Sequence, residues 1–367
     1  MIKLKTAAVI IFVIILISCS KKPEYEKMHI ELLFTIDGGF KAEKAEDYNR
    51  KFTVVSDIEV DSEGILYLFN PRLERIIKFD ANGEYIGYFG SRGTGKGEFL
   101  NAVDFAIMKD TLYIKNTYTN TVIRYTNDGK FIDYFEDKTG KFSLGENLRA
   151  VSDDRFVSYV SNGEKTDEGI LVTNNLSILN KKLEETALLR EYSAKLDKDN
   201  PVFFEFMTKY AYGEGKIFVA ENSENEYKIN IFDTDGNRTG EIVKEYSPAS
   251  YNEAELSKIK SLPISVTKTK DERDTVSTKP VYKKSINALF FDKYNRLIVC
   301  PSVKRTEKDQ HDFIADIFED GKFVKRVVIP QLKGEDMLYR TDSEIYFKGD
   351  RIYEVLHEEL KINVYGF

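Results

Sequence analysis

Residues 57–89 decide the fold of this chain, and they read DIEVDSEGILYLFNPRLERIIKFDANGEYIGYF. Short runs in which apolar and polar residues alternate are separated by turn-forming residues, which is typical of a series of short antiparallel strands. The Asn-Gly pair at 82–83 marks a tight hairpin between the last two runs. The stretch therefore predicts four strands joined by short connections.

The same pattern returns forty-six residues further along the chain, where residues 103–135 read VDFAIMKDTLYIKNTYTNTVIRYTNDGKFIDYF. Matching positions carry the same kind of residue, among them Tyr67 with Tyr113, Asn70 with Asn116, Ile77 with Ile123 and Gly83 with Gly129. Further units begin near residues 150, 209, 286 and 340. A four-stranded unit repeated at this length is typical of the blades of a β-propeller.

The last unit supplies only three strands, and the missing strand lies at the other end of the chain, at residues 29–34. We therefore predict an all-β, six-bladed β-propeller over residues 28–367, in which the N-terminal strand completes the last blade. Closing the ring in this way leaves only short, protected sheet edges. A seven-bladed ring with a decayed blade near residues 185–215 is the alternative, and a pair of β-sandwiches fits a repeat of blade length less well.

The units resemble NHL and related six-bladed propeller repeats, best over residues 52–135. The connection GSRGTGKGEF at residues 90–99 is the most specific part of the resemblance. In NHL repeats such a glycine-rich stretch links the outer strand of one blade to the inner strand of the next. The resemblance implies a six-bladed ring of the kind found in many exported bacterial lipoproteins.

One segment, residues 250–284, lies outside the blade plan between the fourth and fifth units. Ser250 and Glu253 form a capping-box pair that opens a short helix, which Pro263 cannot continue. Residues 258–284 then carry eight Lys or Arg against three acidic residues. We predict a basic loop that meets an anionic surface, a glycan or an envelope protein; a solvated loop without a partner is the alternative. Its candidate ligand-binding residues are Lys258, Lys260, Lys268, Lys270, Lys283 and Lys284.

The first eighteen residues indicate export. Lys3 and Lys5 precede an apolar run that is too short for a bilayer span of ~20 residues. The sequence Leu-Ile-Ser-Cys that ends at Cys19 resembles the lipobox of bacterial lipoproteins. This resemblance implies that a signal peptide, residues 1–18, is removed and that Cys19 is lipidated, with residues 19–27 as a tether. We expect the propeller in the cell envelope, on the outer membrane rather than the inner; an uncleaved anchor helix is the alternative.

Charge and cysteine content limit the partners. Loss of the two signal-peptide lysines takes the net charge from −7 to −9, and an acidic chain lacks the basic footprint of nucleic-acid binding. With Cys19 used for the anchor, Cys300 has no disulfide partner in the chain. It ends an apolar run, and we predict a small buried hydrophobic residue rather than a reactive thiol.

The sequence shows no catalytic constellation. Its three histidines, His29, His311 and His357, are scattered, and none is paired at metal-ligand spacing. We therefore expect neither a metal nor a cofactor. Asn70 and Asn116 follow the second strand of their units and are candidate ligand-binding residues; the alternative is that they satisfy turn backbone groups.

These observations favour a non-catalytic module that binds a ligand or protein, or acts as a scaffold, on the envelope. The alternative is a propeller-type lyase or hydrolase with its site in the central channel. A bound metal and buried channel carboxylates would favour the enzyme, whereas an apolar, filled channel would favour the module. The fold alone does not decide between them.

Overall fold

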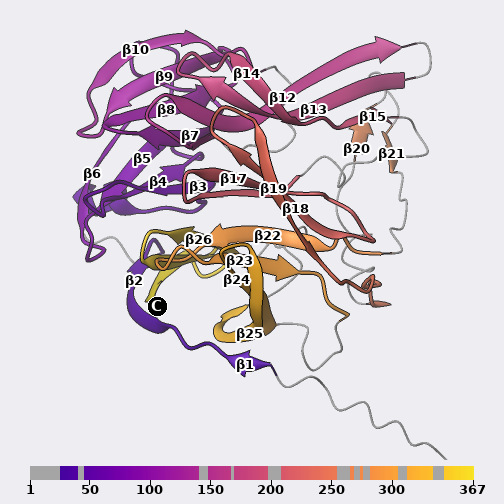
Figure 1. Ribbon diagram of the computed structural model, residues 1–367. Coiled ribbons are helices and arrows are strands. Elements are labelled where there is room, and N and C mark those ends of the chain that lie inside the picture. The colour runs from indigo at the N-terminus through magenta and orange to yellow at the C-terminus, as the bar shows by residue number, and fades with distance from the viewer. Residues whose placement is uncertain are drawn as a thin grey trace, which may run out of the picture.

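The computed structural model is a ring of six four-stranded antiparallel blades (Figure 1). Five blades are built from four consecutive strands, and the sixth takes its outer strand from the N-terminal part of the chain. The first strands of neighbouring blades contact one another around a central channel. The ring confirms the predicted six-bladed propeller. The structure describes residues 25–39, 45–139, 148–166, 169–196, 208–253, 265–267, 273–275, 282–304, 312–333 and 343–367.

Blades one to three occupy the first half of the ring. Their strands are β3 (Asp57–Val60), β4 (Leu66–Asn70), β5 (Arg75–Phe79) and β6 (Tyr85–Phe89); β7 (Ala102–Met108), β8 (Thr111–Asn116), β9 (Thr121–Thr126) and β10 (Phe131–Glu136); and β11 (Arg149–Ala150), β12 (Arg155–Thr166), β13 (Gly169–Asn180) and β14 (Glu185–Arg190), with β15 (Ser193–Leu196) paired to β13.

Blades four to six complete the ring. Their strands are β16 (Tyr210–Gly213), β17 (Lys216–Ala220), β18 (Tyr227–Asp233) and β19 (Arg238–Lys244); β22 (Ile286–Phe291), β23 (Leu297–Pro301), β24 (Asp312–Glu319) and β25 (Lys322–Lys333); and β26 (Ser343–Lys348), β27 (Arg351–Leu356), β28 (Lys361–Gly366) and β2 (Glu31–Asp37).

The N-terminal strand closes the ring, as predicted. β2 pairs antiparallel with β28, with Ile36 opposite Ile362, and the N–H of Gly38 donates to the carbonyl of Leu360 at 2.8 Å. The seven-bladed alternative is excluded, because the described residues of this region, 185–196 and 208–215, supply strands of blades three and four.

A second N-terminal contact was not predicted. β1 (Glu26–Lys27) runs parallel to β25 on the outer edge of blade five (Figure 1). Lys325 Nζ lies 2.5 Å from Glu26 Oε1, and the N–H of Met28 donates to the carbonyl of Val328 at 2.9 Å. The C-terminal end of the predicted tether therefore lies against the propeller. A two-residue strand leaves no periodicity in the sequence, which explains why it was missed.

Turn chemistry explains why the blades form hairpins at these places. Gly83 and Gly129 follow the third strands of blades one and two and adopt φ angles of 82° and 89°, which favour glycine. Blade three has no glycine at this turn. There the Asn180 side chain accepts the N–H of Lys182 at 2.8 Å and of Glu184 at 3.1 Å, and Leu183 takes the positive φ of 54°. An Asn-centred turn thus replaces the glycine.

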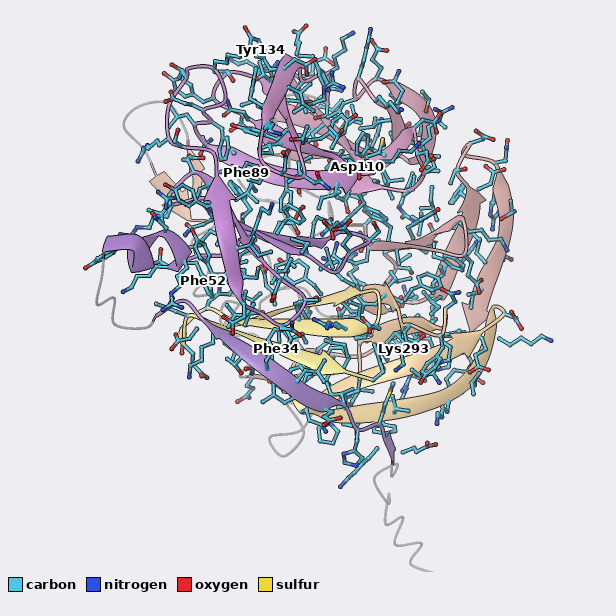
Figure 2. All side chains as sticks on the ribbon, turned by 90° about the vertical axis from the view of Figure 1, so that its left-hand side faces the viewer. Phe34, Phe52, Phe89, Asp110, Tyr134 and Lys293 are labelled. Carbon is cyan, nitrogen blue, oxygen red and sulfur yellow. The ribbon has the colours of Figure 1, made fainter. Side chains whose placement is uncertain are left out.

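The core consists of apolar clusters between neighbouring blades, and one such cluster lies at every interface of the ring among the described residues. Between blades six and one, Ile36 of β2 packs with Ile58 and Val355, with Phe34 of β2 beside them (Figure 2). Between blades five and six, Cys300 is buried on β23, as predicted. Opening one interface therefore exposes a complete apolar cluster.

The insertion leaves the ring after blade four and returns before blade five, where Ser250 and Tyr282 form an isolated bridge. Two short strands within it, β20 (Ser265–Thr267) and β21 (Arg273–Thr275), pair with each other. Most of the helix expected after Ser250 lies outside the described residues. Ala45–Arg50 form a 3-10 helix, and no helix of the described chain is long and apolar enough to cross a membrane.

Candidate functional site

A cavity of about 770 Å³ lies in the central channel. Its walls are the first strands of blades three to six, β11, β16, β22 and β26, with Glu59 added from β3 and Ile107 from β7. It extends to the hairpins that follow β22 and β26, where Lys293 and Asp350 are exposed to solvent. This volume is in the range of sites for small organic ligands.

Strand periodicity places charged side chains in this channel. In β3, Ile58 packs into the cluster between blades six and one, whereas Asp57 and Glu59 lie on the opposite face. In β26, Ile345 packs against blade five, whereas Tyr346 and Lys348 line the cavity. Successive residues of a strand point to opposite faces, so alternating apolar and polar residues give these strands one core face and one polar channel face.

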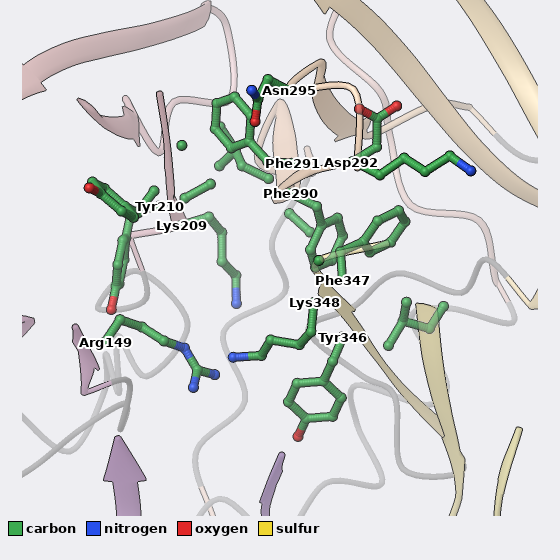
Figure 3. Close-up of a pocket in the computed structure, with 18 of the residues that line it drawn as sticks. Arg149, Lys209, Tyr210, Phe290, Phe291, Asp292, Asn295, Tyr346, Phe347 and Lys348 are labelled. Atoms are coloured by element: carbon green, nitrogen blue, oxygen red, sulfur yellow. The ribbon is translucent and has the colours of Figure 1, made fainter. Parts of the chain in front are cut away.

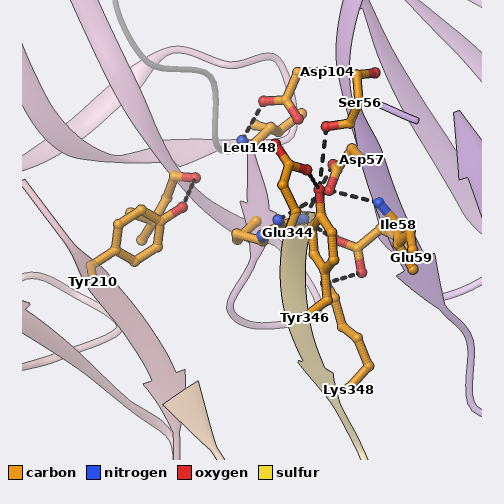
Figure 4. A network of polar contacts seen from close by, with 12 residues as sticks. Ser56, Asp57, Ile58, Glu59, Asp104, Leu148, Tyr210, Glu344, Tyr346 and Lys348 are labelled. Carbon is orange, nitrogen blue, oxygen red and sulfur yellow. Dashed lines mark hydrogen bonds and ion pairs between the residues drawn. The ribbon is translucent and has the colours of Figure 1, made fainter. Parts of the chain in front are cut away.

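Three cationic groups converge in the cavity: the side chains of Arg149, Lys209 and Lys348 (Figure 3). Arg149 binds Asp57 in a bidentate manner, at 3.2 and 3.3 Å, and also donates to Glu59. Lys348 Nζ donates to Glu59 Oε2 at 2.7 Å. These contacts join strands of blades one, three and six into one polar network (Figure 4).

The network shifts the pKa of its members in opposite directions. Burial raises the pKa of Asp57, and the nearby Arg149 offsets this only in part. Burial acts on Glu59 as well, but Lys348 and Arg149 outweigh it and lower the pKa of that carboxyl. Burial would lower the pKa of Arg149, but Asp57 and Glu59 outweigh it and raise that pKa well above its ordinary value. Glu59 and Arg149 are therefore the charged centre of the channel.

Asp104, on β7, extends the network toward blade two. Its carboxylate accepts the backbone N–H of Leu148 at 2.5 Å (Figure 4). Burial raises the pKa of Asp104 well above its ordinary value, and the charge of Asp57 raises it further. Asp104 therefore holds its proton to a higher pH than a solvated aspartate does.

Lys209 differs from the other two cations. Neither an ion pair nor a hydrogen bond of its amino group is found among the described residues. Burial lowers the pKa of Lys209 to about 8. Burial also lowers the pKa of Lys348, and Arg149 adds to this effect. An ammonium group that is partly removed from water and has no counter-ion is energetically costly, so an additional negative charge in this channel would stabilise Lys209.

Aromatic side chains form the rest of the wall. Phe290 and Phe347 are stacked, with ring centroids 4.4 Å apart, and Phe291 packs on Phe218 with centroids 5.1 Å apart. Phe290, Phe291 and Phe347 are only partly buried. The cavity thus combines a cationic region with an aromatic region (Figure 3).

Asn70 and Asn116 are both buried, and both are used within their own blades. The Asn70 side chain accepts the N–H of Leu73 at 3.3 Å. The Asn116 side chain accepts the N–H of Leu100 at 3.1 Å and donates to Thr119 at 2.8 Å. Neither lines the channel cavity. These contacts match the alternative in which the amides satisfy local turn groups.

Of the six candidate lysines of the insertion, two lie within the described residues. Lys283 is 1% exposed, and its ammonium lies 5.5 Å from the ring centroid of Tyr251. Lys284 lies 3.5 Å from Glu224. The other four candidates, Lys258, Lys260, Lys268 and Lys270, lie outside the described residues. Binding of an anionic surface by this loop stays a prediction. Lys283 contacts Tyr251 within the insertion, and Lys284 pairs with Glu224 of blade four.

The described histidines lie away from the channel cavity. His29 is near Gln331, His357 lies 4.0 Å from Glu344, and His311 lies outside the described residues. Within the described ranges no three His, Cys, Asp or Glu side chains are placed to hold a metal ion. The channel is neither the apolar, filled channel expected of a binding module nor a set of free carboxylates expected of an enzyme. It contains buried carboxylates, and two of them, Asp57 and Glu59, are paired with cations.

Comparison with known proteins supports the fold alone. No protein-family model and no curated protein matches this chain. A solved DUF4221 family member from Bacteroides vulgatus is similar to it, at 9% identity over 92% of this chain and 97% of the other, with a TM-score of 0.52. A putative exported protein from Bacteroides fragilis shares 10% identity over 92% and 94% of the chains, at a TM-score of 0.45. Virginiamycin B lyase from Staphylococcus aureus shares 13% sequence identity with it, over 84% of this chain and 94% of the lyase, at a TM-score of 0.39. The chain is thus similar to propeller-type proteins.

Proposed function

We propose that this chain is a non-catalytic binding module of the bacterial cell envelope, held on a membrane by a lipid on Cys19, with the central channel as its ligand site. The observation that carries the binding role is the cavity of about 770 Å³ at the centre of the ring. It combines convergent charged groups with partly buried aromatic rings, as sites for small organic molecules do. The resemblance of the N-terminus to a lipobox supports the anchor.

The arrangement of the channel favours binding over catalysis. Its carboxylates Asp57 and Glu59 are held by Arg149 and Lys348, so they lack the freedom of a general acid and base. Removing Arg149 would leave the buried Asp57 without a cation, which costs several kcal/mol. Removing Lys348 would leave Glu59 with Arg149 as its remaining partner. The network therefore serves to hold three blades together and to fix the charged wall of the cavity.

Ligand binding is tested with the mature chain carrying Cys19→Ala and lacking residues 1–18. The protein is incubated with the small-molecule fraction of a cell-envelope extract and examined by native mass spectrometry. We expect one small molecule per chain to be retained and to raise the unfolding temperature, because a ligand that binds only the folded state stabilises it. A chain that was denatured before incubation is the control. Retention of no molecule from any extract would contradict the proposal.

The anchor is tested by the substitution Cys19→Ala in the full-length precursor. Two or more acyl chains hold a protein at a membrane almost permanently, at ~0.8 kcal/mol per buried methylene. We expect the wild-type chain in the membrane fraction after a high-salt wash, and the variant either unprocessed or released. The matched control is Cys300→Ala, which removes the buried thiol of β23 and should stay in the membrane. A processed Cys19→Ala chain that remains on the membrane would exclude lipidation at this residue.

A lyase or hydrolase acting in the same cavity is the second candidate. The observation in its favour is Lys209, because a lysine whose pKa is lowered to about 8 carries a substantial fraction of neutral amine at slightly alkaline pH. Such an amine can attack a carbonyl group. Incubation with carbonyl compounds and borohydride, followed by mass spectrometry, should label Lys209 if this candidate is correct.

A further inference from the structure

We propose that the channel cavity binds organic carboxylates, with the carboxylate held among Lys209, Arg149 and Lys348 and the apolar body of the ligand against Phe290, Phe291 and Phe347. This inference rests on the proposed binding function and specifies the chemical class of the ligand. Two features support a carboxylate ligand: the balance of charge around the cavity and the geometry of its wall.

At the inner end of the cavity, lined by Arg149, Lys209 and Lys348, one cation has no carboxylate partner within the described part of the chain. Arg149 is paired with Asp57 and Glu59, and Lys348 is paired with Glu59. Among the acidic residues that line the outer end, Asp292 is paired with Arg296 at 2.7 Å, and Asp350 is exposed on a turn next to Arg351. Lys209 therefore faces the cavity without a carboxylate partner among the described residues, and an anionic ligand would supply the missing charge.

The donors needed for a carboxylate are present at one place. Figure 3 shows the ammonium groups of Lys209 and Lys348 and the guanidinium of Arg149 directed toward the same part of the cavity. An ammonium group has three N–H donors and a guanidinium has five. Contacts with Glu59 and Asp57 use only some of them. The remaining donors can bind the two oxygens of a carboxylate by charge-assisted hydrogen bonds.

The aromatic wall argues for an organic ligand rather than an inorganic anion. Phe290 and Phe347 stack with an interplanar angle of 20°, and both line the cavity together with Phe291. These rings are only partly buried, so a ligand that covers them removes apolar surface from water. A cavity of about 770 Å³ is also far larger than an inorganic oxyanion requires.

Asn287 supplies an independent sign that the cavity wall lacks a partner. It lines the cavity from β22, it is 7% exposed, and its Oδ1 has no hydrogen-bond partner in the described part of the chain. Buried polar atoms in folded proteins nearly always have one. A polar atom of a bound ligand, or a water molecule bound with it, would satisfy this side chain.

Binding should be coupled to proton uptake. The charged and titratable groups that line the cavity around Lys209 are Arg149 of β11, Glu59 of β3, Tyr346 and Lys348 of β26 and the neighbouring Tyr210. Burial alone lowers the pKa of Lys209 to about 8. A bound carboxylate favours the ammonium form and raises this pKa, so binding above pH 8 draws a proton from solution. The uptake of protons on binding should therefore be larger at pH 9 than at pH 7.

The test uses the mature chain with Cys19→Ala and three probes, benzoate, phenylacetate and octanoate, each compared with its neutral amide by isothermal titration calorimetry. We expect at least one carboxylate to bind at least tenfold more tightly than its amide. Lys209→Met should weaken that binding at least tenfold and abolish the proton uptake at pH 9. The matched control is Lys216→Met, an exposed lysine of β17 outside the cavity, which should change neither.

The outcomes separate this inference from the function on which it rests. Amides that bind as tightly as the carboxylates, or carboxylate binding that Lys209→Met leaves unchanged, would overturn the carboxylate site while the channel remains a binding site. A failure of all six probes, in a protein that still retains a molecule from the envelope extract, would overturn the carboxylate class in the same way. If neither probes nor extract bind, the proposed function fails as well.

Discussion

Deletion of residues 31–37 should convert the closed ring into an open, aggregating chain. This segment is β2, the outer strand of blade six. Its loss leaves the backbone groups of β28 unpaired and removes Ile36 from the cluster between blades six and one. Unpaired strands associate with other chains. Size-exclusion chromatography and thermal unfolding should show loss of the monomer, and a stable monomer without these residues would exclude closure by β2.

A milder pair of variants keeps this prediction testable if the deletion yields no protein. Ile36 is 5% exposed and Leu33 is 46% exposed on the same strand. Ile36→Ala should cost about 2–4 kcal/mol of unfolding free energy, because it leaves a cavity in the core. Leu33→Ala should cost less than about 0.5 kcal/mol. Equal costs would show that the strand is not packed as described.

Glu59→Gln should be among the most damaging single substitutions in the channel. The change leaves Lys348 without its partner and deprives Arg149 of one of two carboxylates. Removing one partner of a buried ion pair costs about 3–5 kcal/mol, and the partly exposed Arg149 and Lys348 bring the expected cost to about 2–4 kcal/mol. Urea unfolding at pH 7 measures it. An unfolding free energy equal to that of the wild type would show that the network does not stabilise the ring.

Asp104→Asn is the matched control, because this carboxyl lies in the same network but its pKa is raised rather than lowered. For a carboxyl group whose pKa is higher in the folded state, the stability of the fold begins to fall as the pH rises above the ordinary pKa of that group, and the loss is complete once the pH exceeds the raised pKa. The variant should therefore unfold at the same or a higher temperature than the wild type at pH 8. Glu59 affects the pH dependence of stability in the opposite direction. Its pKa is lowered in the folded state, so its contribution to the unfolding free energy is present at neutral pH and is lost on acidification.

The sequence predicts the ring well where each blade carries its own signals. Strand alternation and the turns at Gly83 and Gly129 are local, and they identify blades one and two without any knowledge of the fold. Blade three carries weaker local signals, because Asn180 and Leu183 form its turn in place of a glycine. Closure by β2 was also predictable, because a missing strand at one end matched an extra strand at the other.

The channel site was not predictable in the same way. Asp57 and Glu59 alternate with apolar residues, which reads as an ordinary strand with one solvent-facing side. Arg149 contacts Asp57 across 92 residues of sequence, and Lys348 contacts Glu59 across 289. No local pattern links these partners, and only closure of the ring turns their polar faces toward one another. Charged residues within the first strand of several repeats, such as Asp57, Asp104 and Lys348, are the sequence signal that could have identified the channel.

The contact between β1 and β25 has a geometric consequence if Cys19 carries a lipid. Six residue steps separate Cys19 from Tyr25, and an extended chain covers at most about 3.6 Å per step, so the outer edge of blade five lies within roughly 20 Å of the bilayer surface. With the outer edge of blade five toward the bilayer, the propeller axis would lie parallel to the membrane plane. Both openings of the central channel would then be accessible to diffusing molecules.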